Sequence, residues 1–491
     1  MLRACAFAVV CPATGAASAH TFGTVYNLPV PFSMYAYGAA AALVVSFLIV
    51  AYFATVPGAG SAAREGGAVR QRSVGRIHPA WLAALRIVST SALLLTIIAG
   101  FVGARNAYSN INMTLFWVIF VLGCFYVAAL AGDLYALANP WRVLCDLLER
   151  AAPRMFRPRR PYPRALGYYP ALILYIAFIW IELFANTQPQ SLSVVLLVYT
   201  AINLAGAAFI GKEAWFRYGE FFDVMFRMAG KIAPFEYLRD EGTRGVYRVR
   251  MRKPFIGLIE DSAEHASLLL FVLFMLSSTA FDGIHDTLPW VTVFWKNIYP
   301  ILAGMINRPY VFFVDFYYQW QWSMLVVSPF VYLAVYLFFI WLAKVTAGSA
   351  TPVWTLALRF AFSLVPIAFV YNVTHYYTLL ISQGANIVRL ASDPFGLGWD
   401  LFGTAQWLST PIILDAGGVW HTQVALILFG HIVAVYLAHV EALRCFPGTR
   451  RAIASQLPML LLMVLLTTAG LWILSLPIAA GQVVQPTPAT G

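Results

Sequence analysis

Long apolar runs alternate with short polar stretches along this chain of 491 residues. A run of roughly 20 apolar residues is long enough to cross the hydrocarbon core of a bilayer as a helix. The pattern predicts an all-α fold, a polytopic membrane helical bundle with about ten transmembrane helices. The expected ranges are 33–56, 81–103, 114–137, 165–185, 192–211, 264–281, 323–346, 355–379, 420–442 and 457–478.

The composition supports this class and excludes others. Hydrophobic residues make up 61% of the chain and charged residues 11%, whereas soluble domains carry about 25% charged residues. The formal net charge is +11. In a soluble protein this excess would suggest nucleic acid as a partner. Here we expect the lipid bilayer as the partner and no nucleic acid, because basic loops fix the topology of membrane proteins.

The first residues read as a secretory signal peptide, 1–19, with Ala17-Ser18-Ala19 as the cleavage site. Cleavage would leave His20 at the mature N-terminus. The expected domains are then the signal peptide, one transmembrane helical domain over 20–480, and a flexible tail over 481–491. Ten spans behind a cleaved signal place both termini in the periplasm and the protein in a bacterial inner membrane.

The distribution of Lys and Arg tests this topology. Most of these residues lie in the segments 57–80, 138–164 and 212–263, which all fall on one side of the predicted bundle. The positive-inside rule therefore makes these segments cytoplasmic.

Two segments between the spans are rich in aromatic residues. The segment 212–263 carries aromatic side chains among charges, which predicts an amphipathic segment on the cytoplasmic surface. The periplasmic aromatic segment 282–322 is typical of an interfacial belt, or alternatively of the wall of an apolar substrate pocket.

Ionisable residues inside a bilayer are costly, so each needs a reason. Asp133, at the inner end of the third span, has a structural salt bridge to Arg86 or Arg359 as its simplest explanation. A second group shares the level of the periplasmic interface. It contains Glu182, Asp282, His285, His375, His421 and, after cleavage, His20, with His431 deeper in the ninth span.

Imidazoles mixed with carboxylates are the donors of zinc, manganese or copper sites. The expected metal ligands are His20, His375, His421 and His431, and we expect His375 and His431 to face each other. A bound divalent metal would lower the pKa of a water to about 7 and make it a nucleophile. The alternative is that these histidines lie at the interface or only hydrogen-bond to neighbouring helices.

Several strings resemble bacterial integral-membrane proteins called fenitrothion hydrolases, over nearly the whole chain. They are Ala19-His20 with Asn27-Leu28-Pro29-Val30-Pro31, Gly132-Asp133-Leu134 with Asn139-Pro140-Trp141-Arg142, Leu364-Val365-Pro366 running to Thr374-His375-Tyr376-Tyr377, Ser392-Asp393-Pro394-Phe395-Gly396 with Asp400-Leu401-Phe402-Gly403, and Ser455-Gln456-Leu457-Pro458.

The resemblance implies a hydrolase of organophosphorus triesters such as fenitrothion, an apolar small-molecule substrate that would enter from the membrane. In this hypothesis the catalytic residues are Glu182 and Asp282, acting beside the metal. The competing hypotheses are a membrane transporter or a copper-handling protein that uses the same histidines and acids, and a structural or assembly protein.

Overall fold

The computed structural model describes residues 30–55, 72–156, 160–240, 246–305, 309–407 and 412–476. The predicted signal peptide, His20 and the predicted tail lie outside these residues. The described chain is mostly helical, and ten of its helices are long and apolar enough to cross a membrane. The prediction of an all-α bundle with ten spans is confirmed, and the chain is a multi-pass membrane protein.

The observed elements lie close to the predicted apolar runs. In chain order they are α1 (Phe32–Thr55), β1 (Arg72–Ile77), α3 (Pro79–Val102), α4 (Ile111–Met113), η1 (Thr114–Gly123), α5 (Cys124–Ala131), α6 (Tyr135–Ala138), α7 (Pro140–Ala151), η2 (Arg164–Leu166), α8 (Tyr169–Phe184), α9 (Pro189–Ile210), α10 (Lys212–Tyr218), α11 (Phe221–Gly230), β2 (Phe235–Arg239), β3 (Tyr247–Met251), α12 (Gly257–Glu260), α13 (Ala266–His285), α14 (Leu288–Thr292), η3 (Val293–Ile298), α15 (Tyr299–Ala303), α16 (Pro309–Ala347), α17 (Val353–Phe360), η4 (Ala361–Leu364), α18 (Val365–Ser382), η5 (Gly384–Asn386), α19 (Ile387–Ser392), α20 (Ala416–Cys445) and α21 (Thr449–Ser475).

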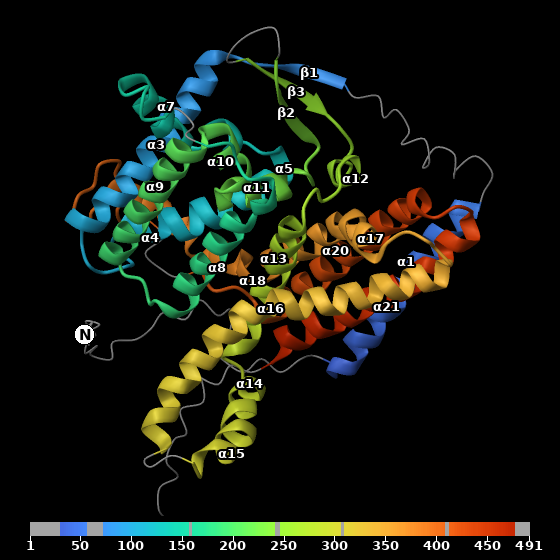
Figure 1. The fold of residues 1–491 in the computed structure, drawn as a ribbon. Coiled ribbons are helices and arrows are strands. Elements are labelled where there is room, and N and C mark those ends of the chain that lie inside the picture. Colours follow the sequence, from blue (N-terminus) through green and yellow to red (C-terminus); the bar gives the residue numbers. More distant parts are fainter. Residues whose placement is uncertain are drawn as a thin grey trace, which may run out of the picture.

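Helix α13 is the centre of the bundle. It is the most buried span, with 89% of its apolar window covered by other residues, and it packs against α8, α16 and α18. One group of helices around α3, α5, α9 and α11 lies on one side of it. The group of α1, α16, α20 and α21 lies on the other (Figure 1). Side chains on α13 therefore face both groups.

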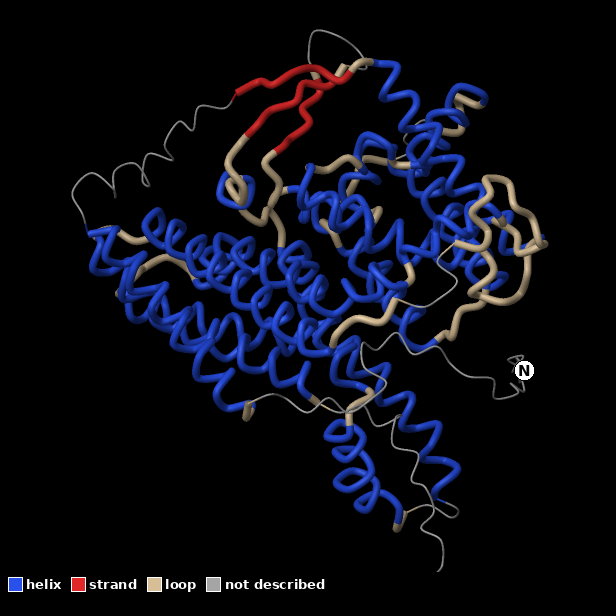
Figure 2. The backbone as a smooth tube through the Cα atoms, turned by 180° about the vertical axis from the view of Figure 1, so that it is seen from behind, coloured by secondary structure: helices blue, strands red, loops and turns tan. Residues whose placement is uncertain are grey.

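A small antiparallel sheet marks one end of the bundle, which we call the sheet end (Figure 2). Its strand order is β1-β3-β2, so segments far apart in the sequence pair there. The hydroxyl of Tyr237 donates to the carbonyl of Ala131 and ties the sheet to α5. At Gly132, which has a positive φ of 93°, a side chain would collide with the carbonyl oxygen of Phe235.

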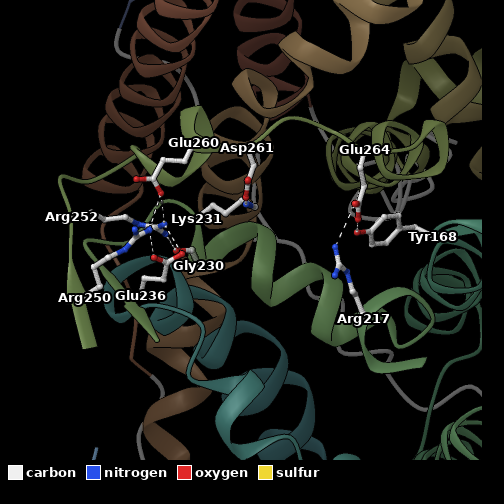
Figure 3. Close-up of polar contacts among 10 residues, drawn as sticks. All are labelled: Tyr168, Arg217, Gly230, Lys231, Glu236, Arg250, Arg252, Glu260, Asp261 and Glu264. Atoms are coloured by element: carbon white, nitrogen blue, oxygen red, sulfur yellow. Dashed lines mark hydrogen bonds and ion pairs between the residues drawn. The ribbon is translucent and has the colours of Figure 1, made fainter. Parts of the chain in front are cut away.

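Ion pairs fasten the sheet to the end of α11 (Figure 3). The buried guanidinium of Arg252 pairs with Glu236 and Glu260 and donates to the carbonyl of Gly230, the last residue of α11. Beside it, Lys231 pairs with Asp261. A buried cation that meets two carboxylates and a carbonyl is well compensated. The loop after α11 is therefore anchored from the sheet side.

The segment 212–263 differs from the prediction. Trp215, Phe216, Phe221, Phe222 and Phe226 are buried in the protein core, and α11 packs against α5 and α8. The expectation of an amphipathic segment on the membrane surface is therefore wrong for α10 and α11. The reason is that an apolar helix face looks the same in the sequence whether lipid or protein covers it.

The aromatic segment forms an arm at the end opposite the sheet, which we call the arm end. The arm consists of α14, η3, α15 and the first turns of α16 (Figure 1). Helix α16 has 39 residues, which span about 58 Å at 1.5 Å per residue, far more than the roughly 30 Å of a bilayer core. The aromatic side chains pack on one another, with the rings of Trp290 and Trp320 stacked at 4.6 Å.

The partner predicted for Asp133 is also wrong. One carboxylate oxygen of Asp133 accepts from the backbone amide of Ala136 at 3.0 Å. Arg86 instead donates to the carbonyl of Leu137, and Arg359 pairs with Glu441. Burial, with the nearby carboxylate of Asp223, raises the pKa of Asp133 to about 7.

Candidate functional site

The candidate site is a cluster of four polar side chains where α13 meets α8 and α18. Nε2 of His375 lies 2.6 Å from Oδ2 of Asp282. The hydroxyl of Tyr376 donates to the same oxygen at 2.6 Å. Tyr376 also makes a side-chain hydrogen bond with Glu182. Asp282, His375 and Tyr376 are all buried. Four chemically active groups are therefore linked inside the bundle.

The local sequence explains how these groups meet. Asp282 and Gly283 lie in the last turns of α13. A Cβ atom on Gly283 would lie 2.7 Å from a methyl group of Ile473 and 3.9 Å from Cε1 of His375. Glycine at this position lets α13 approach α21, whereas the distance to the His375 ring is an ordinary contact. Asp282, in the neighbouring position, lies within hydrogen-bond distance of His375 and Tyr376 on α18.

The Tyr376 hydroxyl restricts the protonation of the two carboxyl groups. A tyrosine hydroxyl has one hydrogen to donate and an oxygen that accepts. That hydrogen is donated to Asp282, and a protonated Glu182 can donate its own hydrogen to the Tyr376 oxygen. The geometry therefore favours one ionised carboxylate, Asp282, and one neutral acid, Glu182.

The carboxyl pair lines a small cavity of about 30 Å³. One water needs roughly 10–15 Å³ of cavity volume, so the cavity has room for about two waters. Its wall is mostly apolar and comes from six helical segments, η1, α5, α8, α11, α13 and α18. The lining residues are Val121, Leu122, Phe125, Tyr175, Phe178, Ile179, Glu182, Met225, Ser278, Thr279, Asp282, Asn372 and Tyr376.

An amide oxygen at the cavity wall lacks a protein partner. Oδ1 of Asn372 is buried and accepts no hydrogen bond from the part of the chain that the structure describes. A buried unsatisfied acceptor is costly and usually indicates a bound water or ligand. This atom therefore supports the interpretation of the cavity as a water site.

Two irregular helices surround the cavity. Segment η1 is a π-helix of ten residues and supplies Val121 and Leu122 to the wall. The predicted span over 355–379 is not one continuous helix, because the 3₁₀ turn η4 separates α17 from α18. π-Helical segments occur often at functional sites, and 3₁₀ segments within helices often mark hinges.

A further pair of ionisable groups connects the cluster to the surface. The ring of His285 lies 4.0 Å from Oδ1 of Asp282 through Nδ1 and 3.4 Å from Oδ2 of Asp286 through Nε2. The side chain of His285 is 5% exposed and that of Asp286 is 46% exposed. The sequence analysis grouped His285 with Glu182 and Asp282 at the level of the periplasmic interface. The structure adds its contacts with Asp282 and Asp286.

The structure separates the other predicted ligands from the cluster. His421 is exposed, and its Nδ1 contacts the carbonyl of Gly417. His431 is fully buried, and its Nδ1 contacts the carbonyl of Ile427 rather than His375. His20 lies outside the described residues.

Over the residues that the structure describes, no three His, Cys, Asp or Glu side chains form a group able to hold a metal. His375 pairs with Asp282 on α13, and His431 contacts the carbonyl of Ile427, so a ligand site shared by His375 and His431 stays a prediction. A metal that uses His20 stays a prediction.

Several site residues were not predicted from the sequence. Tyr376 directly follows His375, so the string His375-Tyr376 was the available signal. Asn372 lies one helical turn earlier on α18. Met225 had no usable signal, because its segment was interpreted as a surface helix.

Comparison with known proteins adds no relative. No protein-family model, no curated protein and no solved structure matches this chain. The resemblance to fenitrothion hydrolases therefore stays a prediction.

Proposed function

We propose that the protein is a membrane-embedded hydrolase of apolar phosphoric triesters, the activity that the resemblance implies. Asp282 acts as the general base on a bound water, and Glu182 acts as the general acid on the leaving oxygen. One observation carries this proposal: the Tyr376 hydroxyl contacts both carboxyls at the wall of a water-sized cavity. Two carboxyls that share one proton divide into an acid and a base.

The proposed reaction uses these groups in order. The carboxylate of Asp282 takes a proton from water as the water oxygen bonds to phosphorus. The bond from phosphorus to the leaving phenol oxygen breaks, and Glu182 supplies the proton that this oxygen needs. Tyr376, which contacts both carboxyls, then passes a proton from Asp282 back to Glu182. His375 is a positioning residue, because it holds Asp282 through Nε2 without lining the cavity.

The cavity admits water but not a triester, so the substrate requires a movement of the surrounding helices. At η1 and η4 the hydrogen bonding of the bundle changes from α-helical to π-helical and 3₁₀-helical. Opening of an apolar wall would let a membrane-dissolved triester reach the carboxyls. Such gating movements are common in enzymes with closed sites.

We propose an inner-membrane location with the arm end in the periplasm. The sheet end carries Arg76, Arg248, Arg250 and Arg252. Basic segments stay in the cytoplasm under the positive-inside rule. The carboxyl pair would then lie nearer the periplasmic face.

A divalent metal remains a separate proposal. A zinc, manganese or copper site would need His20, which lies outside the described residues, as one of its donors. When bound, the metal would supply a water of lowered pKa as the nucleophile.

The test is hydrolysis of a nitrophenyl triester by the purified protein in liposomes, followed by release of nitrophenolate. Asp282→Asn should slow turnover by roughly 10²–10⁴-fold, the usual contribution of a general base. Asp415→Asn is the matched control. Asp415 is exposed and caps α20 by accepting from Gly418, a role that asparagine also fills. A full rate in Asp282→Asn would refute the proposal.

Proton-coupled transport is the second candidate, favoured by a separate set of buried acids. Glu220 and Asp223 are buried at the start of α11, whose Met225 lines the cavity. Met225 and Asp223 are two residues apart and face roughly opposite sides of the helix. Carboxyls on both sides of a buried helix are typical of proton pathways. This candidate would be favoured if the wild-type protein takes up protons into proteoliposomes without hydrolysing triesters. Glu220→Gln should then abolish the uptake.

A further inference from the structure

We propose that His285 is the residue through which the Asp282–Glu182 pair exchanges its proton with solution at the arm end, with Asp286 as the outer acceptor. This inference rests on the proposed function for its role in turnover, but the exchange itself can be measured without hydrolysis. It assigns a function to two residues that the proposed reaction does not use.

The three side chains lie in order from the surface inwards. Asp286 is half-exposed, His285 is buried and Asp282 is buried. Oδ2 of Asp286 lies 3.4 Å from Nε2 of His285, and Nδ1 of the same ring lies 4.0 Å from Oδ1 of Asp282. Imidazole accepts a proton at one nitrogen and releases another from the second, so the ring can transfer a proton without rotating.

The environment of the ring keeps it in this position. Phe281 stacks on His285 at 5.5 Å and Phe184 meets its edge at 5.8 Å, so apolar rings cover two sides. The amide of Gln321 donates to the backbone carbonyl of His285. Aromatic cover separates the cluster from bulk water and leaves the imidazole as the polar link.

The resting geometry also defines the proton step. Nδ1 lies 2.9 Å from the backbone oxygen of Asp282, which only accepts, so Nδ1 carries the hydrogen and Nε2 is the basic nitrogen facing Asp286. A proton from Asp286 forms a bond to Nε2 and makes the imidazolium. The Nδ1–H bond then breaks as its proton passes to Oδ1 of Asp282. Outward transfer is the reverse.

The gap of 4.0 Å is longer than a hydrogen bond. The ring must move by about 1 Å, from the backbone oxygen to the carboxylate of the same residue. The ionisable groups packed around this step are Glu182 on α8, His375 and Tyr376 on α18, and Tyr317 on α16. Tyr376 extends the path from Asp282 to Glu182.

The experiment measures how fast the hydrogen of the protonated carboxyl group exchanges for deuterium. The exchange is followed by the shift of the carboxyl band in the infrared spectrum. Purified protein in liposomes is moved from H₂O to D₂O without substrate, and Glu182→Gln identifies the band. In His285→Gln the band should shift roughly 100-fold more slowly than in the wild type. Added imidazole should restore part of the rate. The matched control His78→Gln, at an exposed cap of α3, should exchange at the wild-type rate.

Asp286→Asn provides a second variant on the exposed side chain and should also slow exchange. Equal exchange rates in His285→Gln, Asp286→Asn and the wild type would overturn the inference, as would the absence of a band that depends on Glu182. If the wild-type protein does not hydrolyse triesters but exchange is still slower in His285→Gln, the proposed hydrolase is refuted. The role of His285 in proton exchange is then still supported.

Discussion

Nε2 of His375 lies 2.6 Å from Oδ2 of Asp282, across the contact between α18 and α13. Neither residue is near the other in the sequence, and each is buried within a spanning helix. The pair joins two helices that both line the cavity, so it couples the position of a reactive carboxylate to the packing of the bundle.

His375→Gln should lower kcat by about 100-fold with little change in KM, because misplacing a reacting group by about 1 Å costs this much. Glutamine can still donate one hydrogen bond but lacks the ring that fixes Asp282. Triester turnover in liposomes measures both constants. A rise in KM at constant kcat would mean that His375 binds substrate instead.

Removal of metal separates the carboxyl mechanism from the metal mechanism. The proposed reaction uses only the carboxyl groups of Asp282 and Glu182, so we expect incubation with a chelator to leave triester hydrolysis unchanged. The measurement is the rate before and after chelation, with metal content determined on the same sample. Loss of activity that zinc, manganese or copper restores would contradict this expectation and favour ligation with His20.

Glu220 makes stability depend on pH. It is buried, and burial, together with the nearby carboxylate of Asp223, raises its pKa from 4.5 to about 8. The folded state then holds a proton that the unfolded state has lost, so stability falls as pH rises from about 4.5 to about 8. One such group contributes up to about 1.4 kcal/mol per pH unit.

Glu220→Gln should flatten this decline, measured as the free energy of unfolding in detergent at several pH values. The slope should be smaller but not zero, because Asp133 and Asp223 also have raised pKa values. Glu149→Gln, at a partly exposed carboxyl that pairs with Lys212, should keep the wild-type slope. Equal slopes in Glu220→Gln and the wild type would be evidence against buried protonation at this position.

Gly470 lets Tyr371 cross α21. A Cβ atom at this position would lie 1.2 Å from the hydroxyl oxygen of Tyr371, which donates to the carbonyl of Leu466. Gly470→Ala should therefore destabilise the protein by about 2 kcal/mol or more, through overpacking and the lost hydrogen bond. Thermal unfolding in detergent measures the effect.

Gly38→Ala is the matched control, because nothing lies within 4 Å of a Cβ atom there and the residue is inside helix α1. Alanine should leave stability unchanged or raise it slightly. Similar unfolding temperatures for the two variants would show that α21 does not pack on Tyr371 as described.

The sequence predicts the spans well because the bilayer imposes a length and a composition on each one. It does not predict that α16 extends into the arm, since an aromatic run at a membrane interface and an aromatic run packed on itself have the same composition. It also does not predict that α11 is buried. Phe221, Phe222 and Phe226 are apolar in either environment, and only the neighbouring helices decide between lipid and protein.

The candidate site was predicted in part. The cost of ionisable groups in a bilayer singled out Glu182, Asp282 and His375 at one level of the membrane. Their actual pairing depends on the packing of α13 against α8 and α18, and no residue pattern indicates that contact. We expected His431 to face His375 because their spans are consecutive. The His431 ring instead contacts the carbonyl of Ile427 on its own helix and lies near the ring of Tyr371.

The pH dependence of kcat/KM tests the central claim most directly, using a triester of unsubstituted phenol, whose leaving oxygen needs a proton. We expect a bell-shaped profile for the wild type, because Asp282 must be ionised and Glu182 must be protonated. Asp282→Asn should lose the rise on the acidic side, and Glu182→Gln should lose the fall on the basic side. Profiles of wild-type shape and height in both variants would contradict the account.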